Sequence, residues 1–202
     1  MSEYVNFFED FPQRSIEVLE AFYSHAKDLQ NSREVTLTIS VAYGALLFPF
    51  ERLRDDAKTP HPSNDLHNFP EHAENFKALM EKPFFSLFPM LNSEWFCGNG
   101  VVDGQIRRSA ERHASKIVGK DKTTKNIVKL IRNALAHSNI LSQDNPIRNL
   151  VFYSEVPNTG NKFSFLRTTP EQFKTFLVEW VKVIRKNRLS QEEYEEVLDE
   201  AA

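Results

Sequence analysis

The sequence predicts a mainly α-helical fold, a helical bundle with a small β-hairpin before the last long helix. Apolar residues recur every three or four positions in residues 12–29, 123–141 and 169–184, as on the buried face of a helix. Residues 149–168 instead combine strand-forming residues with a central turn cluster. The chain has 202 residues, of which 41% are hydrophobic and 26% charged, a composition that fits a single domain.

Two helices, a loop and a short helix are expected in the first part of the chain. Residues 12–29 have one apolar face, and residues 33–53 are apolar nearly all round through their middle, as in a central buried helix. Pro49 is expected to kink or end the second helix, because proline lacks a backbone N–H. Residues 58–70 carry three prolines and are predicted to form a loop or lid, followed by a short helix at 71–80. The apolar face of the first helix consists of Ile16, Leu19, Phe22, Tyr23, Ala26 and Leu29.

The middle of the chain is predicted to contain an irregular aromatic segment followed by a helix. Residues 83–100 are aromatic and interrupted by turn residues, so we expect them to pack over the core without forming a regular element. Residues 123–141 are predicted to form a helix capped by Thr123 and Thr124. The apolar stripe of this helix consists of Ile127, Leu130, Ile131, Ala134 and Leu135.

The hairpin and the last helix have clear local signals. Residues 150–155 and 162–167 are strand-forming, and the turn between them contains Asn and Gly, which tolerate positive φ. Thr169, Pro170 and Gln172 supply an N-cap, a first-turn proline and the third residue of a capping box. The helix that they begin has the apolar face Phe173, Phe176, Leu177, Trp180, Val181 and Ile184.

The predicted organisation is one helical domain over residues 1–189 and an acidic tail over 190–202. The tail holds six acidic residues and no basic one. The single cysteine, Cys97, cannot form an intrachain disulfide, and residues 1–11 are acidic where a signal peptide would be basic and then apolar. Residues 35–50 are too short and too polar to span a bilayer. We therefore expect a cytoplasmic protein with no membrane partner.

A strongly basic segment stands out in a chain whose formal net charge is −3. Residues 105–132 contain nine Lys and Arg against two acidic residues, and phosphate is the natural counterpart of such a charge. The candidate phosphate contacts are Arg112, Lys116, Lys125 and Lys129. The alternative is a solvated basic pair of helices that balances the acidic ends of the chain.

One short motif in this region combines residues with catalytic chemistry. At about 100° per residue, Arg132, Asn133 and His137 fall on one arc of the predicted helix, opposite its apolar stripe. Arginine is a fixed cation with a fork of donors suited to phosphate oxygens, and histidine exchanges a proton near neutral pH. Arg108 and His113 have the same spacing, but no polar amide follows Arg108 and we interpret them as ordinary basic surface.

The segment Arg132-Asn133-Ala134-Leu135-Ala136-His137 resembles the Arg-polar-x3-His motif of HEPN domains (higher eukaryotes and prokaryotes nucleotide-binding). These are all-helical modules found among ribonuclease toxins and antiviral effectors. The order of motif helix, hairpin and final helix is similar to that of a plasmid- and bacteria-encoded HEPN subfamily.

This resemblance implies a HEPN-like bundle that forms a homodimer, in which two motifs face each other and cleave RNA without a metal or other cofactor. His137 would act as general base or acid, Arg132 would stabilise charge on the phosphorane and Asn133 would orient the pair. A toxin-like or phage-defence role, with an antitoxin protein as a further partner, is implied as well. Two alternatives remain open: a non-catalytic RNA- or nucleotide-binding module, and a structural dimerisation domain.

Two other groups of reactive residues are assigned no function. His61, His67 and His72 fall in or beside the predicted loop without helical pairing, so solvated histidines are favoured over metal ligands. Cys97 lies among aromatic residues and is interpreted as a small buried apolar residue.

Overall fold

The computed structural model describes residues 7–29, 33–52, 70–91, 94–101, 115–116, 122–159 and 162–188. The helices are α1 (Phe7–Asp28), α2 (Glu34–Ala42), the π-helical turn η1 (Tyr43–Leu47), α3 (Phe48–Arg52), α4 (Pro70–Glu81), α5 (Phe84–Leu87), the 3-10 turn η2 (Pro89–Leu91), α7 (Thr124–Ala136) and α8 (Pro170–Arg188). The strands are β1 (Phe96–Val101), β2 (Ser115–Lys116), β3 (Ile140–Gln143), β4 (Asn149–Glu155) and β5 (Lys162–Thr168).

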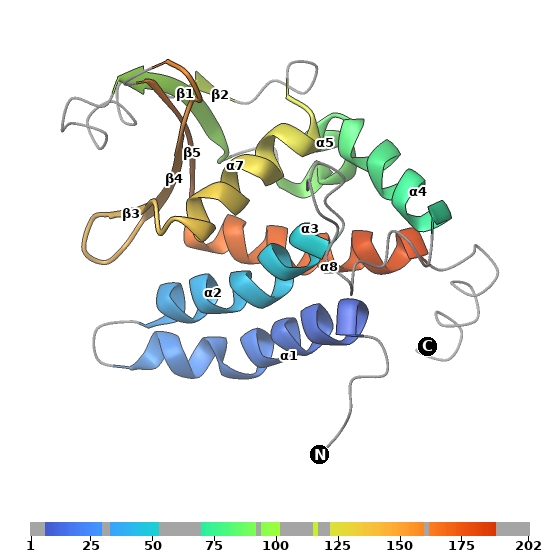
Figure 1. The fold of residues 1–202 in the computed structure, drawn as a ribbon. Coiled ribbons are helices and arrows are strands. Elements are labelled where there is room, and N and C mark those ends of the chain that lie inside the picture. The colour runs from blue at the N-terminus through green and yellow to red at the C-terminus, as the bar shows by residue number, and fades with distance from the viewer. Residues whose placement is uncertain are drawn as a thin grey trace.

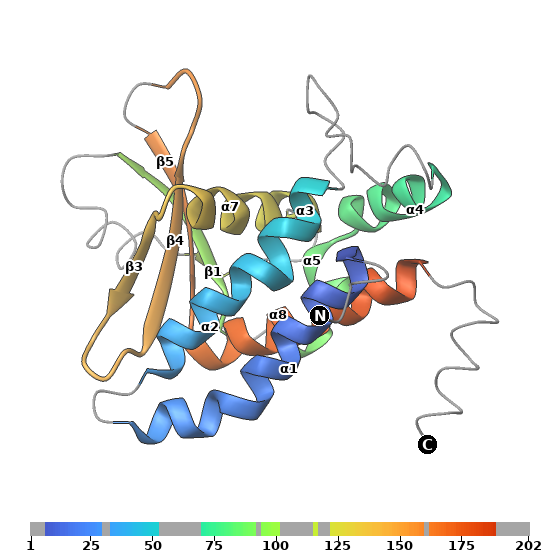
Figure 2. The same ribbon diagram turned by 60° about the horizontal axis from the view of Figure 1, so that its bottom comes forward.

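The helices form a group that is closed at one end by an antiparallel sheet with the order β2-β1-β5-β4-β3. In Figure 1, α1 and α2 lie below α8, while α7 runs above α8 and beside the sheet. The turned view shows α2 and α3 crossing in front of α8 and reaching toward α7 (Figure 2). Helix α7 is therefore held between the sheet and the other helices.

The main core lies between α8, α7 and one face of the sheet. All six residues of the predicted apolar face of α8 are buried, and Trp180 and Phe176 are fully inaccessible to solvent. The ring of Phe176 contacts the rings of Phe84, Phe88 and Trp95 at centroid distances of 5.8, 5.3 and 5.5 Å. Aromatic clusters of this kind bury large areas and fix ring geometry, so α8 is the helix around which the others pack.

The central helix bends at a π-helical turn close to Pro49. Because Pro49 has no N–H, a regular α-helix would lose a hydrogen bond there, and the wider turn at η1 precedes it. Gly44 lies in this turn against α1, where an added Cβ would come 2.3 Å from Ser15 Oγ and 2.9 Å from the Phe11 ring. Only glycine allows the two helices to approach so closely, which agrees with the sequence prediction that helix 33–53 is buried and disturbed by Pro49.

The β-structure is larger than predicted. The expected hairpin is present as β4 and β5, but three more strands extend it on both sides. Residues 96–100, part of the segment 83–100 expected to be irregular, lie in β1, which pairs with β5 along its whole length. Helix 123–141 was predicted too long, because it ends at Ala136 and Ile140–Gln143 pairs with β4 as β3. The outer edges of the hairpin carry backbone N–H and C=O groups that hydrogen-bond to these neighbouring segments. No local sequence pattern reveals this pairing.

The start of the chain differs from its prediction in two respects. Helix α1 begins at Phe7, before Pro12, and the ring of Phe11 packs edge-on against Phe48 at 5.5 Å. Phe22 and Leu29, predicted to lie on its buried face, are 55% and 42% exposed. Residues 58–69 of the predicted loop 58–70 and the acidic tail 190–202 lie outside the described residues, and Pro70, the last residue of that loop, begins α4.

Candidate functional site

Helix α7 carries the motif, and both of its ends are held by specific contacts. Thr123 caps the start of the helix, since its side chain accepts a hydrogen bond from the backbone N–H of Asn126 at 3.3 Å. At the other end, the Tyr43 hydroxyl donates to the carbonyl of Leu135 at 3.0 Å. Ile131, Ala134 and Leu135 are fully buried against the core. The motif side chains therefore project from a rigid element.

Arg132 is engaged by a carboxylate from a distant part of the chain. Its Nε donates to Oε1 of Glu51 at the end of α3, and its Nη1 donates to Oδ1 of Asn133 at 2.7 Å. The Arg132 side chain is 16% exposed and that of Glu51 37%. Two partners therefore orient the guanidinium, and the Arg132 side chain is mostly shielded from solvent.

Asn133 connects Arg132 with the sheet. Its Nδ2 donates to the hydroxyl of Ser154 on β4 at 3.4 Å, while its Oδ1 accepts from Arg132. Such an amide has little freedom to rotate, because its donor and acceptor are both used. The amide of Asn133 therefore links the guanidinium of Arg132 to strand β4.

His137 lies at the C-cap of α7, one residue beyond the helical segment. Its backbone N–H donates to the carbonyl of Asn133 at 3.1 Å, and its backbone has φ −108° and ψ 8°. The side chain is exposed, and no described residue hydrogen-bonds to the imidazole. The ring is therefore accessible to an incoming substrate or to a second protein chain.

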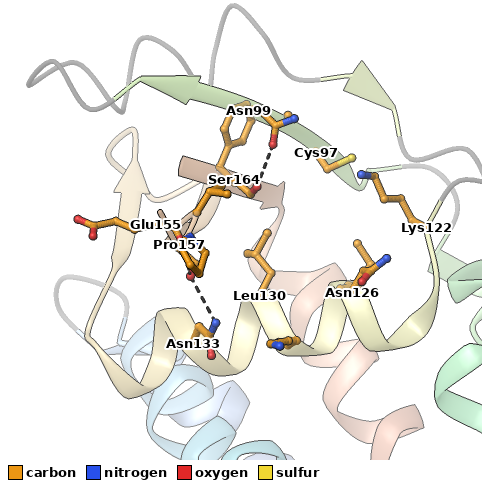
Figure 3. Close-up of a pocket in the computed structure, with 15 residues that line it drawn as sticks. Cys97, Asn99, Lys122, Asn126, Leu130, Asn133, Glu155, Pro157 and Ser164 are labelled. Carbon is orange, nitrogen blue, oxygen red and sulfur yellow. Dashed lines mark hydrogen bonds between the residues drawn. The ribbon is translucent and has the colours of Figure 1, made fainter. Parts of the chain in front are cut away.

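A cleft of about 460 Å³ opens between α7 and the sheet, beside the motif. We call it the α7 cleft. Figure 3 shows Asn126, Leu130 and Asn133 rising from α7 toward the sheet, with Lys122 and Cys97 at one end. Its lining residues are Cys97, Gly98, Asn99, Lys122, Asn126, Ile127, Lys129, Leu130, Asn133, Ser154, Glu155, Val156, Pro157, Ser164 and Phe165.

The residues predicted to contact phosphate are spread over this region. Lys129 is exposed and lines the α7 cleft. Lys125 is exposed and forms an ion pair with Glu81 of α4 at 3.0 Å. Arg112 and the side chain of Lys116 lie outside the described residues. The structure thus brings Lys129 and Asn133 to one cleft, with Arg132 bonded to Asn133.

The sheet wall of the cleft was not found from the sequence. Asn99, Ser154 and Ser164 reach it only because β1, β5 and β4 are neighbours. Ser154 and Ser164 belong to the two strands of the predicted hairpin, so the sequence already indicated that they lie close together. Asn99 could not be found, because it lies in a segment of glycine, cysteine and asparagine that does not read as a strand.

The described part of the chain offers neither a metal site nor a helix that could span a membrane. It holds no group of three or more His, Cys, Asp and Glu that could bind a metal ion. His61 and His67, and the side chain of His72, are outside that part. None of the described helices has the length and apolar character needed to cross a membrane.

Comparison with known proteins identifies one family. A family model described as HEPN pEK499 p136 matches residues 1–191. Comparison with curated proteins and with solved structures gives no match. The matched segment contains the two N-terminal helices, the motif helix, the sheet and α8. This chain therefore belongs to the HEPN pEK499 p136 family.

Proposed function

We propose that this protein is an endoribonuclease that cleaves RNA without a metal, through Arg132 and His137. The observation that carries the proposal is the end of α7, where an oriented guanidinium, a bound amide and an exposed imidazole lie within six residues. Membership of a HEPN family supports it. The sites of proton transfer and charge stabilisation that RNA cleavage needs are both supplied by this one segment.

The reaction uses the nucleophile that RNA itself carries. His137 takes the proton of a ribose 2′-OH, and the 2′ oxygen forms a bond to the adjacent phosphorus. Arg132 stabilises the extra negative charge on the phosphorane, because a fixed cation binds it more strongly than the starting diester. The bond from phosphorus to the 5′ oxygen then breaks, and that oxygen takes a proton from a protonated imidazole, either His137 or its copy in a dimer. The products are a 2′,3′-cyclic phosphate and a 5′-OH.

The proposed active form is a homodimer in which two motif ends face each other. The accessible position of His137 at the C-cap supports this arrangement, since a second copy can approach it without moving the core. In such a dimer one imidazole serves as base and the other as acid. We propose a toxin-like or phage-defence role for the dimer in the cytoplasm, with an antitoxin protein as a further partner.

A second candidate function is a non-catalytic RNA-binding module. The ion pair between Arg132 and Glu51 favours it, because a carboxylate already neutralises the cation that would meet the phosphorane. In this case RNA would bind along Lys129 and the α7 cleft without being cut. The two functions differ in one observable, the length of the RNA after incubation.

The deciding experiment compares four proteins acting on mixed cellular RNA in EDTA: wild type, Arg132→Ala, His137→Ala and His113→Ala. The last variant removes the histidine of the other Arg-x4-His segment and is the matched control. We expect wild type and His113→Ala to leave fragments with 2′,3′-cyclic phosphate ends, and the two motif variants to leave RNA intact. Intact but retained RNA with all four proteins would contradict the enzyme and support the binding module.

A further inference from the structure

The sheet wall of the α7 cleft carries a row of short polar side chains. The strand register places Asn99, Ser164 and Ser154 side by side across β1, β5 and β4. The Ser164 hydroxyl donates to Oδ1 of Asn99 at 2.8 Å, and Ser154 accepts from Asn133 at 3.4 Å (Figure 3). The row therefore runs along the sheet wall of the cleft and ends at Ser154, which is hydrogen-bonded to Asn133 of α7.

Packing does not account for this row. Two positions away along each strand, on the same face of the sheet, the neighbouring row consists of Cys97, Leu166 and Phe152. Leu166 and Phe152 are fully buried in the core. Side chains alternate along a strand, so both rows face α7. Serine and asparagine are poor strand formers beside the β-branched and aromatic residues that would fill such a position. The short side chains leave the cleft open.

The charge and size of the cleft suit a nucleotide. Lys122 and Lys129 come from the helix side, and among the described residues of the lining Glu155 alone is acidic. A volume of about 460 Å³ lies within the range of about 300–1,000 Å³ that is usual for small-molecule sites. An asparagine amide offers both a donor and an acceptor, as the Watson–Crick edge of a base requires.

We propose that the α7 cleft binds one nucleoside of the RNA next to the phosphate held by Arg132, and that Asn99 and Ser164 read the edge of its base. Asn133 contacts both Arg132 and the sheet wall, so the two subsites are adjacent. Lys129 binds the neighbouring phosphate. The inference deepens the proposed function and rests on it, because it assigns base preference to that same site.

The test uses 2′-fluoro tetranucleotides of A, C, G and U, which lack the attacking hydroxyl and cannot be cut. Their affinities are measured for wild type, Asn99→Leu, Ser164→Val and the matched control Asn75→Leu, an exposed amide on α4. Since a well-placed base contact is worth about 1–3 kcal/mol, we expect the two cleft variants to bind the preferred tetramer about tenfold more weakly. The differences among the four bases should shrink as well. The control should bind as wild type does.

The chain's single cysteine supplies a second readout in the unmodified protein. Cys97 lines the cleft, so a bound tetramer should slow its reaction with a small thiol reagent. A tetramer that binds without protecting Cys97 would overturn the inference, as would equal base preference in Asn99→Leu and Asn75→Leu, or no binding of any tetramer to wild type. Protection of Cys97 in a protein that leaves RNA uncut would refute the ribonuclease and retain the cleft as a nucleoside site.

Discussion

The ion pair between Glu51 and Arg132 leads to a quantitative prediction about RNA affinity. Replacing Glu51 with glutamine keeps the shape of the side chain and removes its charge. Two unit charges about 4 Å apart attract by about 4 kcal/mol at an effective dielectric constant of about 20. The side chains of this pair are 16% and 37% exposed, so screening by solvent and the loss of hydration offset most of the attraction. A net stabilisation of about 1 kcal/mol remains.

We therefore expect Glu51→Gln to bind RNA about fivefold more tightly at low salt, because the guanidinium of Arg132 is released to phosphate. One additional phosphate contact should also steepen the plot of log affinity against log salt by about 0.7 for single-stranded RNA. The assay is fluorescence anisotropy with an uncleavable oligonucleotide over a salt series. The gain should disappear when Arg132→Ala is added to Glu51→Gln.

Glu179→Gln is the matched control, because it changes the net charge equally but breaks a pair with Lys182 on α8. If Glu51→Gln and Glu179→Gln show the same affinity and the same salt dependence, Glu51 does not compete with phosphate. Weaker binding by Glu51→Gln would instead make Glu51 a positioning residue that holds Arg132 in its productive orientation.

Three further predictions concern stability. Burial, followed by two nearby carboxylates, raises the pKa of Tyr23 from 10.0 to about 12, so the free energy of unfolding should fall as pH rises through this window. Tyr23→Phe should lack this loss in urea titrations, and an identical pH profile would contradict the assignment. Thr123→Ala should lower the free energy of unfolding by about 1 kcal/mol through loss of the cap to Asn126, whereas Thr123→Ser should restore it. Gly44→Ala should cost about 1–3 kcal/mol in chemical denaturation, because the new Cβ meets Ser15; unchanged stability would show that the helices move apart freely.

Several parts of the fold followed from local sequence patterns. The apolar face of α8 and its Thr169 cap are confirmed, since Thr169 accepts from the N–H of Gln172 at 3.3 Å. The Thr123 cap and the strands of the hairpin are confirmed as well. Each of these features depends on residues that are close together in the sequence, so the spacing of residue types predicts it.

The errors arose where distant segments meet. Strand β1 forms from residues with little strand preference because β5 offers an edge with unpaired backbone groups. The end of α7 at Ala136 depends on pairing of β3 with β4. Phe22 of α1 repeats with helical periodicity, yet its side chain is 55% exposed.

The sequence by itself determined the helix that carries Arg132 and Asn133 and leads to His137, because periodicity and capping act over a few residues. Only the tertiary structure decided what surrounds them. Glu51 lies 81 residues from Arg132, and Asn99 lies 65 residues from Ser164, so neither pair is expressed in any local pattern. Both pairs form because burial of the shared core brings their helices and strands together, and the cleft beside the motif exists only as a result of that packing.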